Sequence, residues 1–230
     1  MVVSTSTPAI SIVVPVYNEE ATIGGLLEGL SSRTFAEIIV VDGGSTDRTA
    51  ELAAPRSRLI RSELGRAAQM NAGAAAASGE MLLFLHADVR LEAGSLDQIR
   101  RAMEDGAIVG GNFDIRYEGG DWIASIFTRF TRWRRNWGIF YGDSGIFCRR
   151  SVFERLGGYR PWPILEDYDF ARRLSKTGRL ALLEDPIWVS DRRWRGSRLL
   201  QTLWIWFLIQ GLYYLGVPPR LLARLYRPVR

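Results

Sequence analysis

The 230 residues suit a single α/β domain, or one such domain with a short appendage. Hydrophobic residues make up 47% and charged residues 24%, which is ordinary for a globular core and argues against disorder as the main state. The single cysteine, Cys148, excludes an internal disulfide framework and a cysteine-rich zinc site, and we expect it to be a small buried residue.

The positive charge lies mainly at the carboxyl end. The net charge is +5, whereas residues 191–230 hold eight arginines and one acid, so this stretch alone carries +7. Such a stretch indicates an anionic surface as partner. No lysine or arginine precedes Arg33, and the apolar run at residues 10–14 is too short to span a bilayer, so we expect no signal peptide and a cytoplasmic catalytic domain.

Short apolar runs alternate with helical patterns through the first 85 residues. This alternation predicts a mostly parallel sheet with right-handed crossovers. Either Ser45 or Thr46 is expected to cap the second helix. The expected strands are residues 10–14, 38–41, 59–60 and 81–85, and the expected helices are residues 19–30, 45–53 and 67–77.

The alternation becomes less regular after residue 86. Residues 108–117 have the pattern of an antiparallel or edge strand. The apolar residues of the segment 121–137 form one helical stripe interleaved with arginines, which predicts either a second membrane or acceptor surface or a core-facing helix with a solvated basic side. Further helices are expected at residues 95–104, 153–158 and 166–177. We predict a catalytic domain at residues 1–195 and membrane-associated or packing helices at residues 196–230.

Polar clusters follow the first two predicted strands, where ligands collect in open α/β sheets. The first cluster runs from Pro15 through Tyr17 to Glu19. In the second, Gly43-Gly44 permit a tight turn and Asp42 can accept hydrogen bonds from a base or ribose. The alternative is that Asp42 only forms a turn that caps the next helix. Repetition of such clusters at successive strand ends favours a nucleotide site.

A third cluster, His86-Ala87-Asp88, follows the fourth predicted strand. A buried carboxylate must be paired or coordinate a metal, because burial of a bare charge is costly. Mg²⁺ and Mn²⁺ bind through one or two carboxylates together with substrate phosphates, and Asp88 fits that pattern. His86, the one histidine, has three alternative roles: a second metal ligand, a diphosphate contact or a structural group.

A fourth cluster, residues 166–169, contains three acids and opens a predicted helix. The helix dipole favours acids in a first turn, but three acids in four positions exceed what capping requires. A general base for an acceptor hydroxyl must lie within hydrogen-bond reach of it, and a carboxylate suits this task. Asp167 is the candidate base.

The four clusters in this order resemble family 2 glycosyltransferases of the GT-A fold over roughly residues 10–195. Residues 12–19 are similar to the family's opening strand and loop, and residues 40–47 to its V-D-D-G-S-x-D segment, with Gly43 for the second Asp. His86-Ala87-Asp88 stands at the D-x-D motif, with His for the first Asp. Glu166-Asp167 resembles the E-D motif, and residues 190–194 resemble Q-x-x-R-W, with Ser for Gln.

The resemblance implies an inverting transfer from a UDP- or GDP-sugar with Mg²⁺ or Mn²⁺ as cofactor. It implies that Asp88 binds the metal and that Asp167 is the catalytic base. Met70 stands where many members carry Arg, so Arg66 is the alternative phosphate contact. The expected donor-binding residues are Pro15, Tyr17, Glu19, Asp42, Arg66, His86 and Arg193, and the expected acceptor-side residues are Asp143, Glu166 and Trp194.

Residues 199–217 are uncharged, rich in aromatic side chains and flanked on both sides by arginines. This pattern is typical of an interfacial helix at anionic lipid. A packing or homodimer helix and a membrane span are the alternatives, and basic flanks on both sides argue against a span. We therefore expect residues 197–230 to contact the inner face of the cell membrane. We also expect the acceptor to be lipid-linked or hydrophobic. No nucleic-acid partner is expected, because no nucleic-acid motif is present.

Two other functions remain open at this point. A nucleotidyltransferase requires a glycine-rich basic loop after the first strand, whereas residues 16–20 are acidic and glycine-poor. A non-catalytic membrane-associated module that binds nucleotide sugars is compatible with the departures at His86 and Met70.

Overall fold

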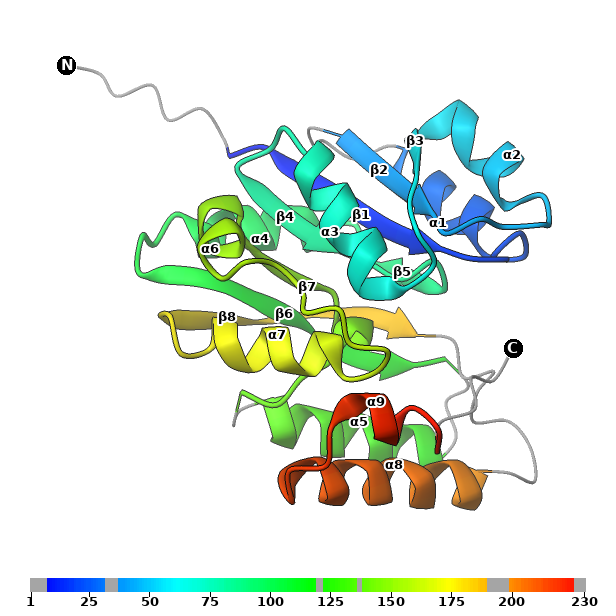
Figure 1. Cartoon of the computed structure of the whole chain (residues 1–230). Helices are drawn as coiled ribbons and strands as arrows, with labels where there is room; N and C mark the ends of the chain where they lie inside the picture. Colours follow the sequence, from blue (N-terminus) through cyan, green and yellow to red (C-terminus); the bar gives the residue numbers. More distant parts are fainter. Residues whose placement is uncertain (1–7, 32–36, 119–121, 136–137, 190–198, 226–230) are drawn as a thin grey trace.

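The computed structural model describes residues 8–31, 37–118, 122–135, 138–189 and 199–225. Its centre is an eight-stranded sheet with the order β3-β2-β1-β4-β7-β6-β8-β5 (Figure 1). The strands are β1 (Ile10–Val16), β2 (Glu37–Asp42), β3 (Arg58–Arg61), β4 (Met81–Phe84), β5 (Val89–Leu91), β6 (Ile108–Tyr117), β7 (Ile146–Arg149) and β8 (Arg179–Val189).

The first four strands in the sheet order form the parallel half that the sequence predicts. Strand β1 pairs in parallel with β2 and with β4, and β2 pairs in parallel with β3. The other half is mixed, because β7 runs antiparallel to β4 and β6, whereas β8 runs parallel to β6. The alternative of an edge strand for residues 108–117 is wrong, since β6 lies between β7 and β8 and most of its side chains are buried. The sequence analysis missed β5, β7 and β8.

Helices cover both faces of the sheet. Helices α1 and α4 pack with the alternate side chains of β1 and β4 in one apolar cluster, and α3, α6 and α7 pack on the opposite face. Gly73 allows α3 to approach the sheet, because a Cβ there would lie 2.3 Å from Cγ1 of Val13. The helices on these faces are α1 (Ile23–Leu30), α2 (Thr49–Ala53), α3 (Arg66–Ala76), α4 (Ser95–Met103), α6 (Arg150–Arg155) and α7 (Glu166–Leu174).

Several helices begin or end at residues other than those expected. Helix α1 begins at Ile23 rather than residue 19, and α6 spans Arg150–Arg155 rather than 153–158. Helix α2 begins at Thr49, with Arg48 at the N-cap position and no side-chain cap hydrogen bond, so the expected cap at Ser45 or Thr46 is wrong. The reason is that Ser45 and Thr46 already bond to side chains of the two strand-end loops. Cys148 is fully buried, as expected.

Helix α5 (Trp122–Arg135) packs against the sheet through arginines. Arg135 lies 3.2 Å from the buried carboxylate of Asp114 on β6, and Arg132 contacts the same carboxylate. Ile126 and Trp133 are 53% and 59% exposed. The expectation of a core-facing apolar stripe is therefore wrong for Ile126 and Trp133, because Arg135 rather than these side chains is buried against Asp114.

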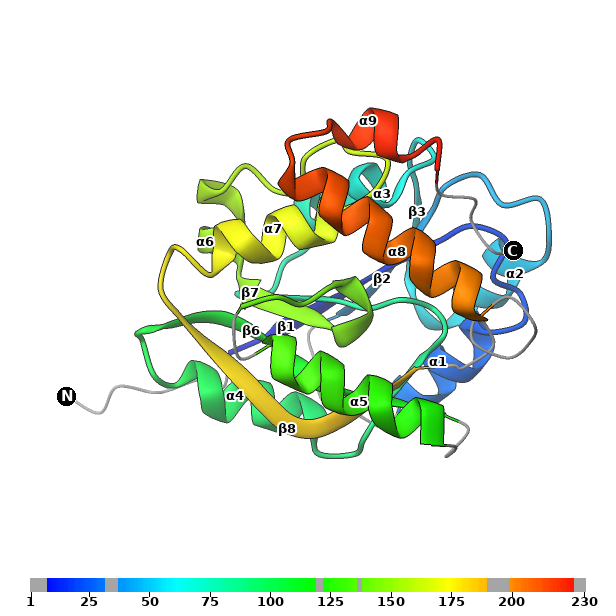
Figure 2. The same ribbon diagram turned by 90° about the horizontal axis from the view of Figure 1, so that it is seen from below.

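Helices α8 (Leu199–Tyr214) and α9 (Pro219–Leu222) lie beside α7 in both views (Figures 1 and 2). They form a third apolar cluster with the start of α7, in which Ile209 and Leu222 pack with Ile164, Leu165 and Tyr168. Across the described ranges, no helix has both the length and the apolar character that a bilayer crossing requires.

Candidate active site

The carboxyl ends of β1, β2 and β4 lie along one edge of the sheet. Because these strands are parallel, with Val16 opposite Asp42 and Val13 opposite Phe84, the segments that follow them all leave from that edge. The first three polar clusters predicted from the sequence are therefore neighbours.

The first two clusters are tied together by hydrogen bonds. The backbone N–H of Asn18 donates to Oγ of Ser45 at 2.9 Å, and the N–H of Thr46 donates to Oδ1 of Asn18 at 2.9 Å. Asn18 has φ +55°, in the left-handed region that Asn tolerates better than most residues. The N–H of Glu19 also donates to the Thr49 hydroxyl at 2.7 Å. These bonds hold the two loops as one unit.

Asp42 is buried and forms a turn with Ser45, but this turn does not cap α2, which begins at Thr49. Its Oδ1 accepts hydrogen bonds from the N–H and the hydroxyl of Ser45, at 3.0 and 2.5 Å. Its Oδ2 has no hydrogen-bond partner among the residues that the structure describes. The nucleotide contact stays a prediction. Pro15, Tyr17 and Glu19 are half-buried near the end of β1.

Gln69 is a buried residue beneath these loops that the sequence analysis missed. Its Nε2 donates to the carbonyls of Val16 and Val41, at 2.7 and 2.9 Å, and so joins the ends of β1 and β2. The amide also packs against Gly43, because a Cβ on that glycine would lie 3.1 Å from Nε2. A polar residue on an alanine-rich helix is the signal that could have identified it.

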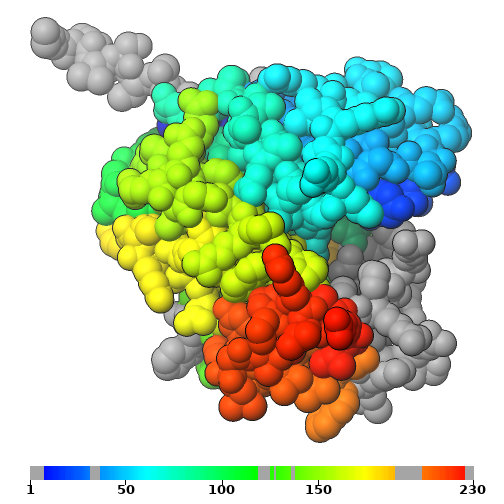
Figure 3. Space-filling view, viewed as in Figure 1, coloured from blue at the N-terminus to red at the C-terminus, as the bar shows by residue number. Residues whose placement is uncertain are grey.

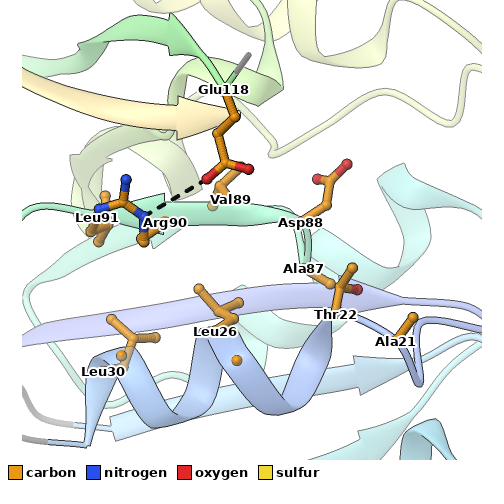
Figure 4. Close-up of a pocket in the computed structure, with 12 residues that line it drawn as sticks. Ala21, Thr22, Leu26, Leu30, Ala87, Asp88, Val89, Arg90, Leu91 and Glu118 are labelled. Carbon is orange, nitrogen blue, oxygen red and sulfur yellow. Dashed lines mark ion pairs between the residues drawn. The ribbon is translucent and has the colours of Figure 1, made fainter. Parts of the chain in front are cut away.

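Asp88 is half-buried and borders a cavity of about 370 Å³ between α1 and β5. Figure 4 shows Thr22 at the start of α1 close to Ala87 and Asp88, and the ion pair between Arg90 and Glu118 at 3.8 Å near β5. No three His, Cys, Asp or Glu side chains gather as a metal-binding group within the described ranges. A metal at Asp88 would therefore take further ligands from substrate phosphates, as Mg²⁺ commonly does.

His86, Gly142 and Asp167 come together from three separate segments. The N–H of Gly142 donates to Oδ2 of Asp167 at 2.8 Å. A Cβ on Gly142 would lie 2.9 Å from Nε2 of His86 and 3.2 Å from Oδ2 of Asp167. The N–H of Tyr168 donates to Oδ1 of Asp167 at 2.7 Å, so both carboxylate oxygens are held by backbone groups. Half-buried Asp143 follows Gly142 in η2 (Gly142–Ser144).

Glu166, expected on the acceptor side, is buried and pairs with an arginine of α3. Its Oε1 lies 2.8 Å from Nε of Arg66, the first residue of α3. Burial raises the pKa of Glu166 to about 7, and the positive charge of Arg66 opposes that shift. Arg66, expected as a phosphate contact, thus joins α3 to α7 in this structure.

Asp169 is the third acid of the fourth cluster, and its role is structural. It pairs with Arg160 at 3.1 Å and with Arg173 at 2.7 Å. The excess of acids in this turn is therefore partly explained by an ion-pair network. Arg193 and Trp194, expected on the donor and acceptor sides, lie outside the described residues, as does the predicted domain boundary at residue 195.

Comparison with known sequences identifies the family. Residues 11–157 match the family described as "Glycosyl transferase family 2". A PGL/p-HBAD biosynthesis glycosyltransferase of Mycobacterium bovis is 32% identical over 180 residues, covering 72% of this chain and 69% of the relative. Glycosyltransferase AglE of Haloferax volcanii is 31% identical over 174 residues, covering 67% and 57%. This chain belongs to glycosyl transferase family 2, and this membership weighs against the nucleotidyltransferase alternative.

Solved structures confirm the GT-A type of α/β fold. Mannosyltransferase PcManGT from Pyrobaculum calidifontis, solved with GDP-Man and Mn²⁺, has a TM-score of 0.69 at 22% identity and covers 90% of this chain. S. aureus TarS, solved with UDP-GlcNAc, has a TM-score of 0.67 at 19% identity and covers 84%. The present chain spans 63% and 60% of these two chains.

Proposed function

We propose that this chain transfers a sugar from a UDP- or GDP-sugar to an acceptor hydroxyl or phosphate, with inversion at the anomeric carbon. One observation carries the proposal: Asp167 on α7 and His86 after β4 both lie against Gly142, beside the strand ends where donors are expected. The proposed base is thus close to the segment that leads to the predicted metal residue, Asp88.

The donor would lie along the edge formed by β1, β2 and β4. Pro15, Tyr17 and Glu19 would contact the base and ribose together with Asp42, because these residues follow β1 and β2 at that edge. His86 is proposed as a diphosphate contact. Arg66 is 36% exposed on its side chain, which leaves it accessible to a phosphate beside Glu166.

Asp88, with His86 nearby in the chain, would hold a Mg²⁺ or Mn²⁺ ion. When bound, the ion neutralises charge that develops on the leaving nucleoside diphosphate. The half-buried carboxylate of Asp88 fits this task, since hard divalent cations prefer oxygen ligands and commonly take their further ligands from substrate phosphates.

Asp167 would act as the general base. As the acceptor oxygen bonds to the anomeric carbon, the hydroxyl proton passes to Asp167 and the bond from that carbon to the β-phosphate oxygen breaks. The nucleoside diphosphate leaves with the bonding electrons, and attack from the opposite face inverts the configuration. The N–H groups of Gly142 and Tyr168 orient the carboxylate before the acceptor arrives.

The acceptor is proposed to be lipid-linked or otherwise hydrophobic, and to be reached at the inner face of the cell membrane. Exposed arginines, among them Arg129, Arg220 and Arg224, accompany the apolar side chains and suit anionic headgroups. The large exposed apolar side chains on α5 and α8, or just after α8, include Ile126, Trp133, Trp204, Phe207, Leu208 and Leu215.

A donor screen tests the proposal. Thermal unfolding would be measured with UDP- and GDP-sugars in the presence of Mn²⁺, of Mg²⁺ or of EDTA. A ligand that binds only the folded state stabilises it by about 2.7 kcal/mol at one hundred times its Kd, so one nucleotide class should raise Tm only with metal. That donor should then release nucleoside diphosphate when a polyprenyl-phosphate acceptor is added. Donor binding without turnover for any acceptor would instead indicate the non-catalytic module.

A vesicle assay tests the membrane contact separately. Sedimentation with anionic vesicles should exceed that with neutral vesicles and should weaken as salt is raised. The double variant Trp204→Ser, Phe207→Ser should bind the anionic vesicles several-fold more weakly, because it removes buried apolar area at the interface. Equal sedimentation with neutral and anionic lipid would contradict the contact.

A further inference from the structure

The helices α8 and α9 rest on the segment that carries the candidate base. Leu165 precedes Glu166 and has φ +62°, a left-handed conformation that a leucine rarely adopts. Such a conformation costs on the order of 1–3 kcal/mol and persists only where the surroundings determine it. Here Leu165 is buried in the cluster to which Ile209 of α8 and Leu222 of α9 contribute. Figure 3 shows the carboxyl-terminal helices packed against this part of the surface.

Tyr168, next to Asp167, is enclosed by aromatic rings from two directions. Its ring stacks on Tyr141 with centroids 5.5 Å apart, and it meets the edge of Tyr213 at 5.7 Å. Its hydroxyl hydrogen-bonds the hydroxyl of Tyr214 on α8. Trp206, also on α8, meets Tyr141 at 6.2 Å. Helix α8 therefore contacts both tyrosines of the stacked pair.

The two N–H donors that hold the candidate base belong to Tyr168 and to Gly142, the residue after Tyr141. The N–H of Tyr168 donates to one carboxylate oxygen of Asp167, and the N–H of Gly142, which follows Tyr141, donates to the other. A shift in the separation of the two rings would therefore move one donor relative to the other. Helix α8 touches neither oxygen, so its influence on the carboxylate passes through Tyr141 and Tyr168.

We infer that helix α8 is a positioning element for catalysis, and that Tyr168 and Tyr214 are positioning residues that set the carboxylate of Asp167 through their shared hydroxyl bond. The inference rests on the proposed role of Asp167 as base. Helix α8 would thus have a task besides the proposed contact with the membrane. Its packing against Tyr168 would set the orientation of the Asp167 carboxylate.

The hydroxyl pair is not required for packing alone. A ring without a hydroxyl fills nearly the same volume, and a hydroxyl in an apolar cluster is costly unless it is paired. Burial, together with the hydrogen bond to Tyr214, raises the pKa of Tyr168, so the Tyr168 hydroxyl keeps its proton at neutral pH. The pair therefore fixes the placement of α8 on α7, which apolar contacts alone specify less tightly.

Single variants of the full chain test the inference. Tyr214→Phe and Tyr168→Phe remove the hydroxyl bond and keep the rings, and each should lower kcat about 3- to 10-fold, because small misplacements of a catalytic group are costly. KM for the donor should stay within about twofold, since the donor loops are untouched. The double variant should fall no further than the single variants, because either change removes the same bond.

Tyr213→Phe is the matched control. It makes the same chemical change at the adjacent position of α8, and the Tyr213 hydroxyl makes no hydrogen bond to any other residue that the structure describes. Its kcat should equal that of the wild type. All rates would be measured with a short-chain, water-soluble acceptor and no vesicles, so differences in membrane binding do not affect kcat. The temperature would be well below the lowest Tm of the series, so unfolding does not affect kcat either.

The outcomes separate this inference from the proposed function. Asp167→Asn would be measured in parallel. If Asp167→Asn is inactive while Tyr214→Phe and Tyr168→Phe turn over like Tyr213→Phe, the positioning role is wrong and the base assignment stands. If Asp167→Asn retains turnover, the base assignment fails first. An increase in donor KM without a change in kcat would also overturn the inference.

Discussion

The donor side and the acceptor side of this molecule are built in different ways. The loops after β1 and β2 are hydrogen-bonded to each other and, through Gln69, to the parallel strands beneath them. Asp167 instead lies outside the parallel half of the sheet, where it bonds to η2 and sits on α7 with α8 packed behind. Changes on the donor side should therefore alter donor binding, and at the proposed metal residue turnover as well, whereas changes around Asp167 should act mainly on turnover. Of four substitutions, Asp167→Asn and Asp88→Asn test this difference directly.

Asp167→Asn should have the largest effect. Loss of the base should lower kcat about 10²- to 10⁴-fold while donor binding and Tm change little. Release of nucleoside diphosphate measures turnover, and circular dichroism checks the fold. Asp97→Asn, an exposed position on α4, serves as the matched control and should retain full activity.

Asp88→Asn should remove the effect of metal on donor binding. Because electrostatic stabilisation of the leaving group is lost, turnover should fall by about 10²- to 10³-fold. The Tm shift caused by the nucleotide sugar should become the same with Mn²⁺ and with EDTA. A metal-dependent Tm shift that survives in Asp88→Asn would show that the metal is held by other residues.

Gly142→Ala should act on both His86 and Asp167. The new Cβ would lie 2.9 Å from Nε2 of His86 and 3.2 Å from Oδ2 of Asp167, so the imidazole must move. We expect kcat to fall roughly tenfold, and donor affinity to weaken as well because His86 is the proposed diphosphate contact. Gly106→Ala is the control, because a Cβ at Gly106 meets no atom within 4 Å. Equal kcat values for the two variants would contradict the close approach.

Glu166→Gln should produce the smallest effect, on the pH dependence of stability. The pKa of Glu166 is raised to about 7 in the folded chain by burial, so the folded state binds more protons than the unfolded state between about pH 4.5 and 7. Stability from this group is thus present at low pH and is lost as pH rises through that window, by at most about 1.4 kcal/mol per pH unit.

Urea unfolding at pH 5, 6, 7 and 8 measures that slope. In Glu166→Gln the slope should be shallower than in the wild type, and in the exposed variant Glu154→Gln it should be unchanged. A wild-type slope that persists in Glu166→Gln would assign the titration to another group.

Much of the fold could be predicted because its first half repeats a local pattern. The β-branched run of β1 and the strands β2 and β4 are each apolar and short, and helices alternate with them, so a parallel sheet follows from periodicity. Strands β5, β7 and β8 could not be found in this way. Strand β8 contains Pro186, a residue that argues against a strand, and β5 has only three residues.

The exposure of the α5 side chains and the packing position of α8 also depend on residues that are distant in sequence. The aromatic stripe of α5 predicts burial by periodicity alone, but the buried carboxylate of Asp114 draws Arg132 and Arg135 to the sheet instead. Likewise, an uncharged helix does not reveal that Tyr214 bonds to Tyr168. Such pairings involve residues 18 to 46 positions apart, which no local pattern records.

The sequence by itself determined which residue types could carry the chemistry and that three of the four clusters follow strands, because strand periodicity and loop composition are local properties. It also determined the family, through the order of those clusters. Only the tertiary structure placed His86 and Asp167 together against Gly142 and set α8 against Tyr168, because these contacts arise from the packing of segments that chain connectivity does not bring together.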